Sequence, residues 1–150
     1  MIDRRHLLAL LPAMALAECG PKPPATLNIT MIGSADQNPD PSGKAQPVAV
    51  TLYQLTQTAK FESADVFALT EHEQQTLGAD DVGSQQFVLS PGETQVKQFQ
   101  LKPGVTAIGV AVLYQQIDNA QWRADAPVKD SGSTKLTLNV NKLAITLKPS

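Results

Sequence analysis

Short runs with an apolar residue at every second position constrain the fold of this chain more than any other feature. Residues 26–35 (TLNITMIGSA) and 48–55 (VAVTLYQL) both show this period of two, which indicates strands with one buried face. In the second run, Tyr53 and Leu55 fall on the opposite face from the two valines. We expect the two runs to be neighbouring antiparallel strands.

The second half of the chain consists of further short runs separated by turn residues. The most apolar of them, residues 105–117 (VTAIGVAVLYQQI), is the candidate central strand. In QVKQFQL the apolar residues Val96, Phe99 and Leu101 alternate imperfectly, for which a β-bulge would account. Seven or eight short strands joined by turns indicate a mostly β fold, an antiparallel β-sandwich, in one domain over residues 26–150.

The pattern changes over residues 57–78, where apolar residues recur at helical spacing. We expect one short helix over residues 57–61 and a second over residues 63–75. Ser63 would cap the second helix, and Gly78 would stop it. The sandwich therefore carries a small helical insertion after its second strand.

Residues 36–47 (DQNPDPSGKAQP) form a long break between the first two strands. Three prolines, a glycine and three Asp or Asn residues in twelve positions all favour turns. Long loops in compact domains are uncommon and are often functional. Because prolines stiffen the loop, ordering it on binding costs less entropy, so we expect it to recognise another protein.

The candidates for catalysis and metal binding are few. His72 is the one histidine after residue 18, and a zinc-protease helix would need a second one where Thr76 stands. No nucleophile-elbow motif is present. We therefore expect a solvated His72, no zinc site and no enzymatic activity.

The other metal site that the sequence suggests is a calcium-binding EF-hand loop. Asp36, Asn38 and Asp40 match the first three ligand positions of an EF-hand loop. The sixth position should be glycine and is Pro41, and the twelfth should be glutamate and is Pro47. We expect no metal and no cofactor.

The charge of the chain argues against a nucleic-acid binder. Twelve lysines and arginines oppose fourteen acidic residues, which gives a net charge of −2, and no cluster of basic residues follows residue 18. Trp122, the one tryptophan, is expected to pack in or against the core rather than to bind a sugar. We expect no nucleic-acid partner and no small-molecule substrate.

The N-terminal segment has the marks of a secretory signal peptide over residues 1–18. Arg4 and Arg5 precede an apolar run at residues 7–17, which is too short to span a membrane at ~20 residues. The arginine pair leaves both the general and the twin-arginine export routes open. The single cysteine, Cys19, follows directly, so no disulfide can form within the chain.

The sequence around Cys19 resembles a bacterial lipobox. Leu16 and Ala17 fit that signal, whereas Glu18 stands where a small residue is usual. The resemblance implies cleavage before Cys19 and its acylation, and several acyl chains hold a protein stably in a membrane. Gly20, in place of an aspartate, resembles an outer-membrane sorting signal. The alternative is a soluble secreted protein with a free thiol.

A proline-rich stretch separates Cys19 from the first strand. Residues 20–25 (GPKPPA) favour the extended polyproline conformation and reach roughly 19 Å at ~3.1 Å per residue. We expect residues 19–25 to form a lipidated, semi-rigid tether.

Several motifs, taken in order, resemble the TssJ (SciN/VasD) family of type VI secretion lipoproteins. They are NPDPSGKAQPVAVTLYQL, FESADVFAL, LGAD, LSPGET and DNAQWRA, which together extend over essentially the whole chain after the signal peptide. The resemblance implies a transthyretin-like β-sandwich in the periplasm, anchored by Cys19 to the outer membrane.

The resemblance also implies a partner and a binding site. Family members bind the periplasmic C-terminal domain of the inner-membrane protein TssM, and with TssL they form a membrane complex. Their contact with TssM is the loop between the first two strands. In this sequence the loop consists of Asp36, Gln37, Asn38, Pro39, Asp40, Pro41, Ser42, Gly43, Lys44, Ala45, Gln46 and Pro47.

Two other classes of function stay open at this point. A periplasmic lipoprotein carrier would need a concave apolar pocket in the sandwich. A secreted hydrolase would need His72 in a cleft beside a nucleophile.

Overall fold

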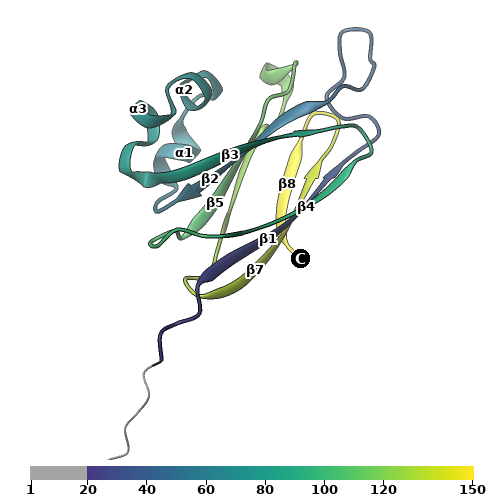
Figure 1. Cartoon of the computed structure of the whole chain (residues 1–150). Helices are drawn as coiled ribbons and strands as arrows, with labels where there is room; N and C mark the ends of the chain where they lie inside the picture. Colours follow the sequence, from purple (N-terminus) through teal and green to yellow (C-terminus); the bar gives the residue numbers. More distant parts are fainter. Residues whose placement is uncertain (1–19) are drawn as a thin grey trace, which may run out of the picture.

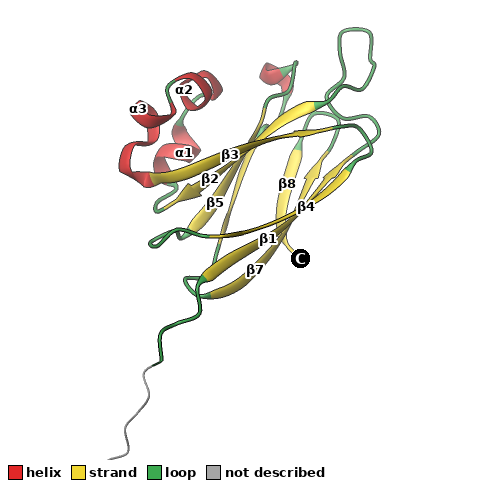
Figure 2. Ribbon diagram, viewed as in Figure 1, coloured by secondary structure: helices red, strands yellow, loops and turns green. Residues whose placement is uncertain are grey.

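The computed structural model describes residues 20–150, so Cys19 and the predicted signal peptide lie outside the described residues. Within this part, eight strands form two four-stranded sheets that face each other (Figures 1 and 2). The strands are β1 (Ala25–Gly33), β2 (Val48–Leu55), β3 (Asp81–Leu89), β4 (Thr94–Gln100), β5 (Ala107–Val112), β6 (Arg123–Pro127), β7 (Gly132–Val140) and β8 (Ile145–Pro149).

One sheet has the strand order β4-β1-β7-β8 and the other β3-β2-β5-β6. Every pairing is antiparallel except that of β1 with β7, which is parallel. The prediction of a mostly β sandwich is therefore confirmed.

The expectation that the first two strands pair with each other is wrong. β1 pairs with β4 and β7, whereas β2 lies in the other sheet between β3 and β5. The loop over residues 36–47 carries the chain from one sheet to the other. The alternation of apolar residues specifies which face of a strand is buried but not which strand lies beside it.

The inner faces of the two sheets form the main core. It contains the alternating residues of β1, β2, β5 and β7. All six residues of β5 are buried, as the apolar run predicts. Both faces of β5 are covered, one by the opposite sheet and one by the helical insertion, so the strand reads as continuously apolar.

The helical insertion consists of three short helices and a 3-10 turn, where the sequence predicted two helices. It contains α1 (Ala59–Ser63), α2 (Val66–Glu71), α3 (Glu73–Leu77) and the 3-10 turn η1 (Gly78–Asp80). The predicted helix over residues 63–75 is thus broken at His72. Ser63 ends α1 and does not cap α2, because Asp65 takes that role by accepting a 2.8 Å hydrogen bond from the Ala68 amide.

A second apolar cluster fixes the insertion to the outer face of the β3-β2-β5-β6 sheet. Phe61, Leu69 and Leu77 from the three helices are fully buried against Tyr53 and Leu55 of β2. The Phe61 ring needs the glycine at position 109 of β5, where a Cβ atom would lie 2.9 Å from its tip.

The β-bulge expected in β4 is absent, since all seven residues of β4 pair with β1 in register. Val96 points outward and is 68% exposed, while Lys97 takes the inward position with its Nζ 5.1 Å from the centre of the Phe87 ring. Within the described residues, a register shift occurs instead between Gln54 and Leu55 of β2, where β2 pairs with β3.

Candidate functional site

The candidate loop and the start of the chain lie at opposite ends of the sandwich. β1 begins at Ala25, directly after the proline-rich stretch, and ends at Gly33, directly before the loop. Nine residues of strand span roughly 30 Å. Figure 1 shows the loop projecting beyond one end of the sheets and the N-terminal stretch leaving at the other. A domain held at its N-terminus would therefore present this loop away from the point of attachment.

Gln37 fixes the first half of the loop to the body of the domain. Its side chain is completely buried, and Nε2 donates hydrogen bonds to the carbonyls of Leu89 (2.7 Å) and Gln46 (3.3 Å). A Cβ atom at Gly33 would collide with Oε1 of Gln37. Gln37 thus has a structural role and is not available to a partner.

Asn38 ties the loop to two other connections. Its Nδ2 donates to the Pro47 carbonyl (2.9 Å), and its Oδ1 accepts from the Gln115 amide (2.8 Å). Its own amide donates to the Lys142 carbonyl (3.1 Å). The backbone has φ = 47°, a left-handed conformation that asparagine tolerates better than most residues.

The tip of the loop is organised around the Asp40 carboxylate. Oδ1 accepts hydrogen bonds from the Ser42 hydroxyl (2.6 Å), the Ser42 amide (2.9 Å) and the Lys44 amide (2.9 Å). Oδ2 accepts from the Gln46 side chain (3.0 Å). The hydrogen bond from Ser42, followed by that from Lys44, holds the pKa of Asp40 below its usual value. The tip is therefore ordered before any partner binds.

Backbone contacts close the tip into a narrow hairpin. The Asp40 amide donates to the Lys44 carbonyl, the Gly43 amide donates to the Asp40 carbonyl, and Pro39 forms a bridge with Ala45. Gly43 has φ = 86°, which a residue with a side chain rarely adopts.

The twelve predicted loop residues fall into two groups. Gln37, Asn38 and Pro39 are buried and support the loop, and the other nine are partly or fully exposed. The exposed nine are Asp36, Asp40, Pro41, Ser42, Gly43, Lys44, Ala45, Gln46 and Pro47. The supporting contacts from Gln115 and Lys142 have no signal in the sequence, because they join positions far apart in the chain.

The three residues that match EF-hand ligand positions each form hydrogen bonds with protein groups. Asp36 accepts from the Ser34 hydroxyl, Asn38 bonds to Pro47 and Gln115, and Asp40 bonds within the tip. Within residues 20–150, no three His, Cys, Asp or Glu side chains are grouped as metal ligands.

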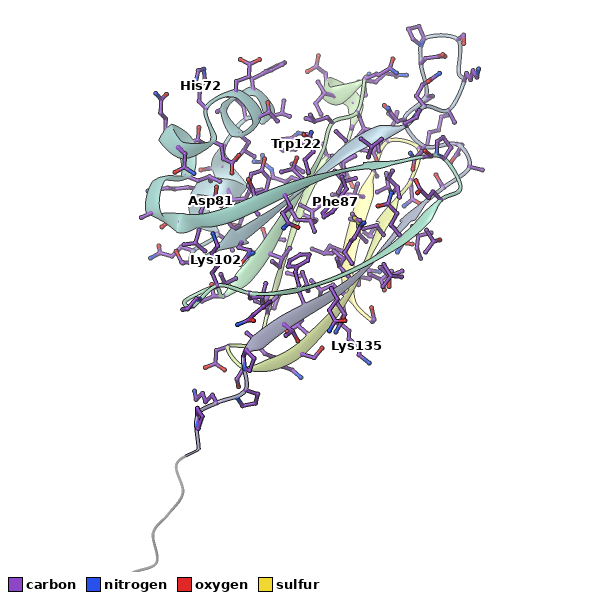
Figure 3. The ribbon with its side chains drawn as sticks, in the orientation of Figure 1. His72, Asp81, Phe87, Lys102, Trp122 and Lys135 are labelled. Atoms are coloured by element: carbon purple, nitrogen blue, oxygen red, sulfur yellow. The ribbon has the colours of Figure 1, made fainter. Side chains whose placement is uncertain are left out.

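His72 and Trp122 lie apart from each other in the structure (Figure 3). His72 is exposed at the junction of α2 and α3. Trp122 packs partly buried against both apolar clusters, as expected, with the Arg123 guanidinium 4.5 Å from the centre of its ring. Arg123 also donates to the carbonyls of Phe61 and Ala64, so it fastens the end of α1 to β6.

The N-terminal stretch is exposed and has no regular secondary structure over residues 20–24. It contacts the domain through an exposed ion pair between Lys22 and Asp130 at 3.3 Å. The predicted lipid site, Cys19, precedes the described residues. Among the helices that the structure describes, none has the length and apolarity needed to cross a bilayer.

Comparisons with known proteins identify the family and the fold of this chain. The family model for type VI secretion lipoproteins, described as VasD, EvfM and TssJ, matches residues 25–143. The crystal structure of the lipoprotein TssJ1 from Pseudomonas aeruginosa is 31% identical in sequence with a TM-score of 0.82, covering 85% of this chain and 98% of that one. No curated protein sequence matches this chain.

Two further solved structures share the fold. Serratia marcescens Lip, a membrane-bound component of the type VI secretion system, is 21% identical with a TM-score of 0.78, over 85% of this chain and 98% of Lip. A chain in a structure named for the TssM C-terminal domain from EAEC is 25% identical with a TM-score of 0.70, over 83% of this chain and 98% of that one. From the family model and the likeness to TssJ1, the chain belongs to the TssJ/VasD family of type VI secretion lipoproteins.

Proposed function

We propose that this protein is anchored in the outer membrane by acylated Cys19 and binds the periplasmic C-terminal domain of TssM through the loop over residues 36–47. It would then link the outer membrane to the inner membrane, and to TssL indirectly through the membrane complex. The observation that carries this proposal is the pre-ordered loop at the opposite end of the sandwich from the N-terminal stretch.

The loop suits protein recognition for a physical reason. Its ends are held by buried side chains and its tip by the Asp40 carboxylate, so little conformational entropy is lost when a partner binds. The tip offers Lys44, the prolines and several exposed backbone groups to a partner. The likeness to a chain in the TssM structure from EAEC supports TssM as that partner.

Deleting residues 41–44 and closing the gap with two glycines tests the loop. This change keeps Gln37 and Asn38, so the domain should unfold at the same denaturant concentration as the parent. We expect binding to the TssM C-terminal domain to weaken at least tenfold in a calorimetric titration. The matched control replaces Lys129, exposed near the N-terminal end, with alanine. Unchanged affinity in the deletion variant would exclude the tip as the contact.

Replacing Cys19 with serine tests the anchor separately. The variant should leave the membrane fraction and lose secretion, while its purified domain still binds TssM. If it still sediments with the outer membrane, Cys19 is not the anchor.

We further propose that the protein is not an enzyme and not a carrier. In the described part, the inner faces of the two sheets pack together into one apolar core, whereas a carrier would need a pocket between them. The shallow depression around His72 is lined by Thr70, Glu71, Glu73, Gln74 and Gln75. This set includes no serine or cysteine nucleophile for a hydrolase.

A further inference from the structure

The two open sides of the sandwich are protected very differently. On one side the edge strands β6 and β8 have five residues each, carry prolines and charged residues, and are joined by a bridge between Gln121 and Ala144. On the other side the edge strands β3 and β4 have nine and seven residues and no proline, but β4 has Lys97 in an inward position, whereas β3 has no charged residue after Asp81. Short strands, prolines and charged residues are the means by which proteins block unwanted strand pairing, so β3 is the edge most open to it.

The middle of β3 presents unpaired backbone groups at this edge. The carbonyl of Val82 accepts from Lys102 Nζ, and that of Val88 accepts from Gln95 Nε2, so both ends of the edge are covered by side chains. Alternate residues of a strand face the same way. The Val88 carbonyl points away from β2, and Ser84 and Gln86 lie four and two positions before it, so their N–H and C=O groups also point outward.

A groove of about 420 Å³ runs beside this part of β3 on the outer face of the sheet. Its floor is formed by Thr51 and Tyr53 of β2, one wall by residues 84–86 of β3, and the other wall by Thr70, Glu73 and Leu113. A strand added to β3 would place every second side chain on the same face as Ser84 and Gln86, and a long side chain could extend from there across Ser84 into the groove.

Glu73, one of the residues that line the groove, is half of a pair of carboxyl groups. Glu73 of α3 contacts Asp81, the first residue of β3. Asp81 is only 7% exposed; its Oδ1 accepts from the Gly83 amide at 3.0 Å, and its buried Oδ2 has no hydrogen-bond partner among the described residues. Figure 3 shows Asp81 below the helical insertion with Lys102 on the same side of the molecule. The Lys102 ammonium already donates to Val82.

The pKa of Asp81 is consistent with a missing cation. Burial, followed by the Glu73 carboxyl group beside it, raises the pKa of Asp81 to about 6. An unpaired buried carboxylate is costly, and a cationic group at hydrogen-bond distance would remove most of that cost. Two carboxylates are too few for a calcium site, which needs six or more oxygen ligands. A lysine or arginine side chain fits the pair better.

We propose that the β3 edge at residues 84–86 is a strand-addition site for an extended protein segment that places a lysine or arginine side chain in the groove against Glu73 and Asp81. The backbone of the segment would bond to Ser84 and Gln86, which gives affinity, and its basic side chain would give specificity. This site is separate from the loop over residues 36–47, so its failure would leave the proposed TssM contact untouched.

The test uses isotope-labelled domain and synthetic peptides in an NMR titration. The domain can be studied alone. The crystal structure of TssJ1 matches 85% of this chain over 98% of its own length, so that crystal contains the same single domain. The probe is an end-blocked nonapeptide of alternating threonine and valine with arginine at its centre. One control peptide has glutamate at the centre, and another has the arginine but is N-methylated at alternate residues, which prevents strand pairing.

We expect the arginine peptide to shift the amide signals of Ser84, Gln85 and Gln86, and both control peptides to leave them in place. Glu73→Gln should weaken binding of the arginine peptide at least fivefold. Glu71→Gln, which removes the same charge from the exposed end of α2, should not change it.

Three results of the peptide titration would overturn the proposal. They are the absence of shifts at millimolar peptide, equal binding of the glutamate or N-methylated peptide, and an unchanged affinity in Glu73→Gln. Shifts at β3 that depend on domain concentration without peptide would also overturn it, since the occupant would then be a second copy of the chain.

Discussion

The two longest connections of the sandwich follow its first two strands, and they are held in place by different forces. The loop over residues 36–47 is held by hydrogen bonds, from Gln37 and Asn38 at its base and from Asp40 at its tip. The helical insertion is held by Phe61, Leu69 and Leu77, which are fully buried. A loop fixed by polar groups can change its exposed residues without loss of core, whereas an insertion fixed by apolar burial is part of the core.

The difference predicts where changes unfold the protein and where they only alter binding. Because about 25 cal/mol is gained per Å² of apolar surface buried, the insertion contributes stability directly. The exposed tip of the loop buries little apolar surface, so we expect it to affect binding rather than stability.

The largest expected effect is that of Phe61→Ala. Its ring is fully buried against Tyr53, 5.4 Å between ring centres, and over Gly109. Removing a buried phenylalanine costs about 3–5 kcal/mol of unfolding free energy. Chemical denaturation would measure this loss. Phe67→Ala is the matched control, since that ring is 62% exposed on α2 and should change stability by less than about 0.5 kcal/mol. Equal losses in the two variants would show that the insertion is not part of the core.

The next largest effect is that of Asp81→Asn, which tests the polar contact between the insertion and β3. The folded state holds a proton on Asp81 up to about pH 6, whereas the unfolded state releases it near 3.8. The folded protein therefore binds more protons between these values, and its stability falls as pH rises from about 4 to about 6. The asparagine variant lacks this loss and should be more stable than the parent at pH 7.5 by up to about 3 kcal/mol, since each pKa unit corresponds to about 1.4 kcal/mol.

Denaturation at pH 4 provides the control for Asp81→Asn. At this pH Asp81 is protonated in the folded parent and only about half ionised in the unfolded parent, so the two stabilities should differ by less than about 1 kcal/mol. The same gain at pH 4 and at pH 7.5 would show that ionisation of Asp81 is not the cause.

Much of the fold could be predicted from the sequence because it depends on local patterns. The period of two placed Tyr53 and Leu55 on the second face of their strand, and that face is the one that the insertion buries. Strand partners were not predictable, since pairing of β1 with β4 and β7 depends on contacts between distant residues. Helix ends were missed for a local reason: Asp65 competes with Ser63 as a cap.

The site shows the same division between local and distant signals. The turn residues of the loop marked it as a loop, and Asp40 organises it as such residues do. That Gln37 and Asn38 are buried could not be inferred, because polar residues are mostly exposed and their partners Leu89 and Gln115 lie 52 and 77 positions away.

Asn38→Ala should have a smaller effect on stability than the two changes above. It leaves the Gln115 amide without its acceptor and puts alanine at a positive φ, which together cost about 1–2 kcal/mol. Thermal or chemical unfolding would measure the loss. Ser42→Ala, at the exposed tip, is the control and should be nearly neutral. If Asn38→Ala were also neutral, the base of the loop would not depend on hydrogen bonds.

Asp40→Ala should have the smallest effect on stability, and it is the most direct test of the difference between the loop and the helical insertion. The carboxylate orders the tip but supports no core residue, so the denaturation midpoint should not move. Without it the amides of Ser42 and Lys44 lose their acceptor, and their hydrogen exchange should speed up. Since a looser tip loses more entropy on binding, affinity for the TssM C-terminal domain should fall by about fivefold. Asp36→Ala, which removes a neighbouring acidic residue bonded to Ser34 alone, should change neither exchange at the tip nor affinity. A lower denaturation midpoint for Asp40→Ala would mean that the tip is coupled to the core, and the loop and the insertion would then differ only in degree.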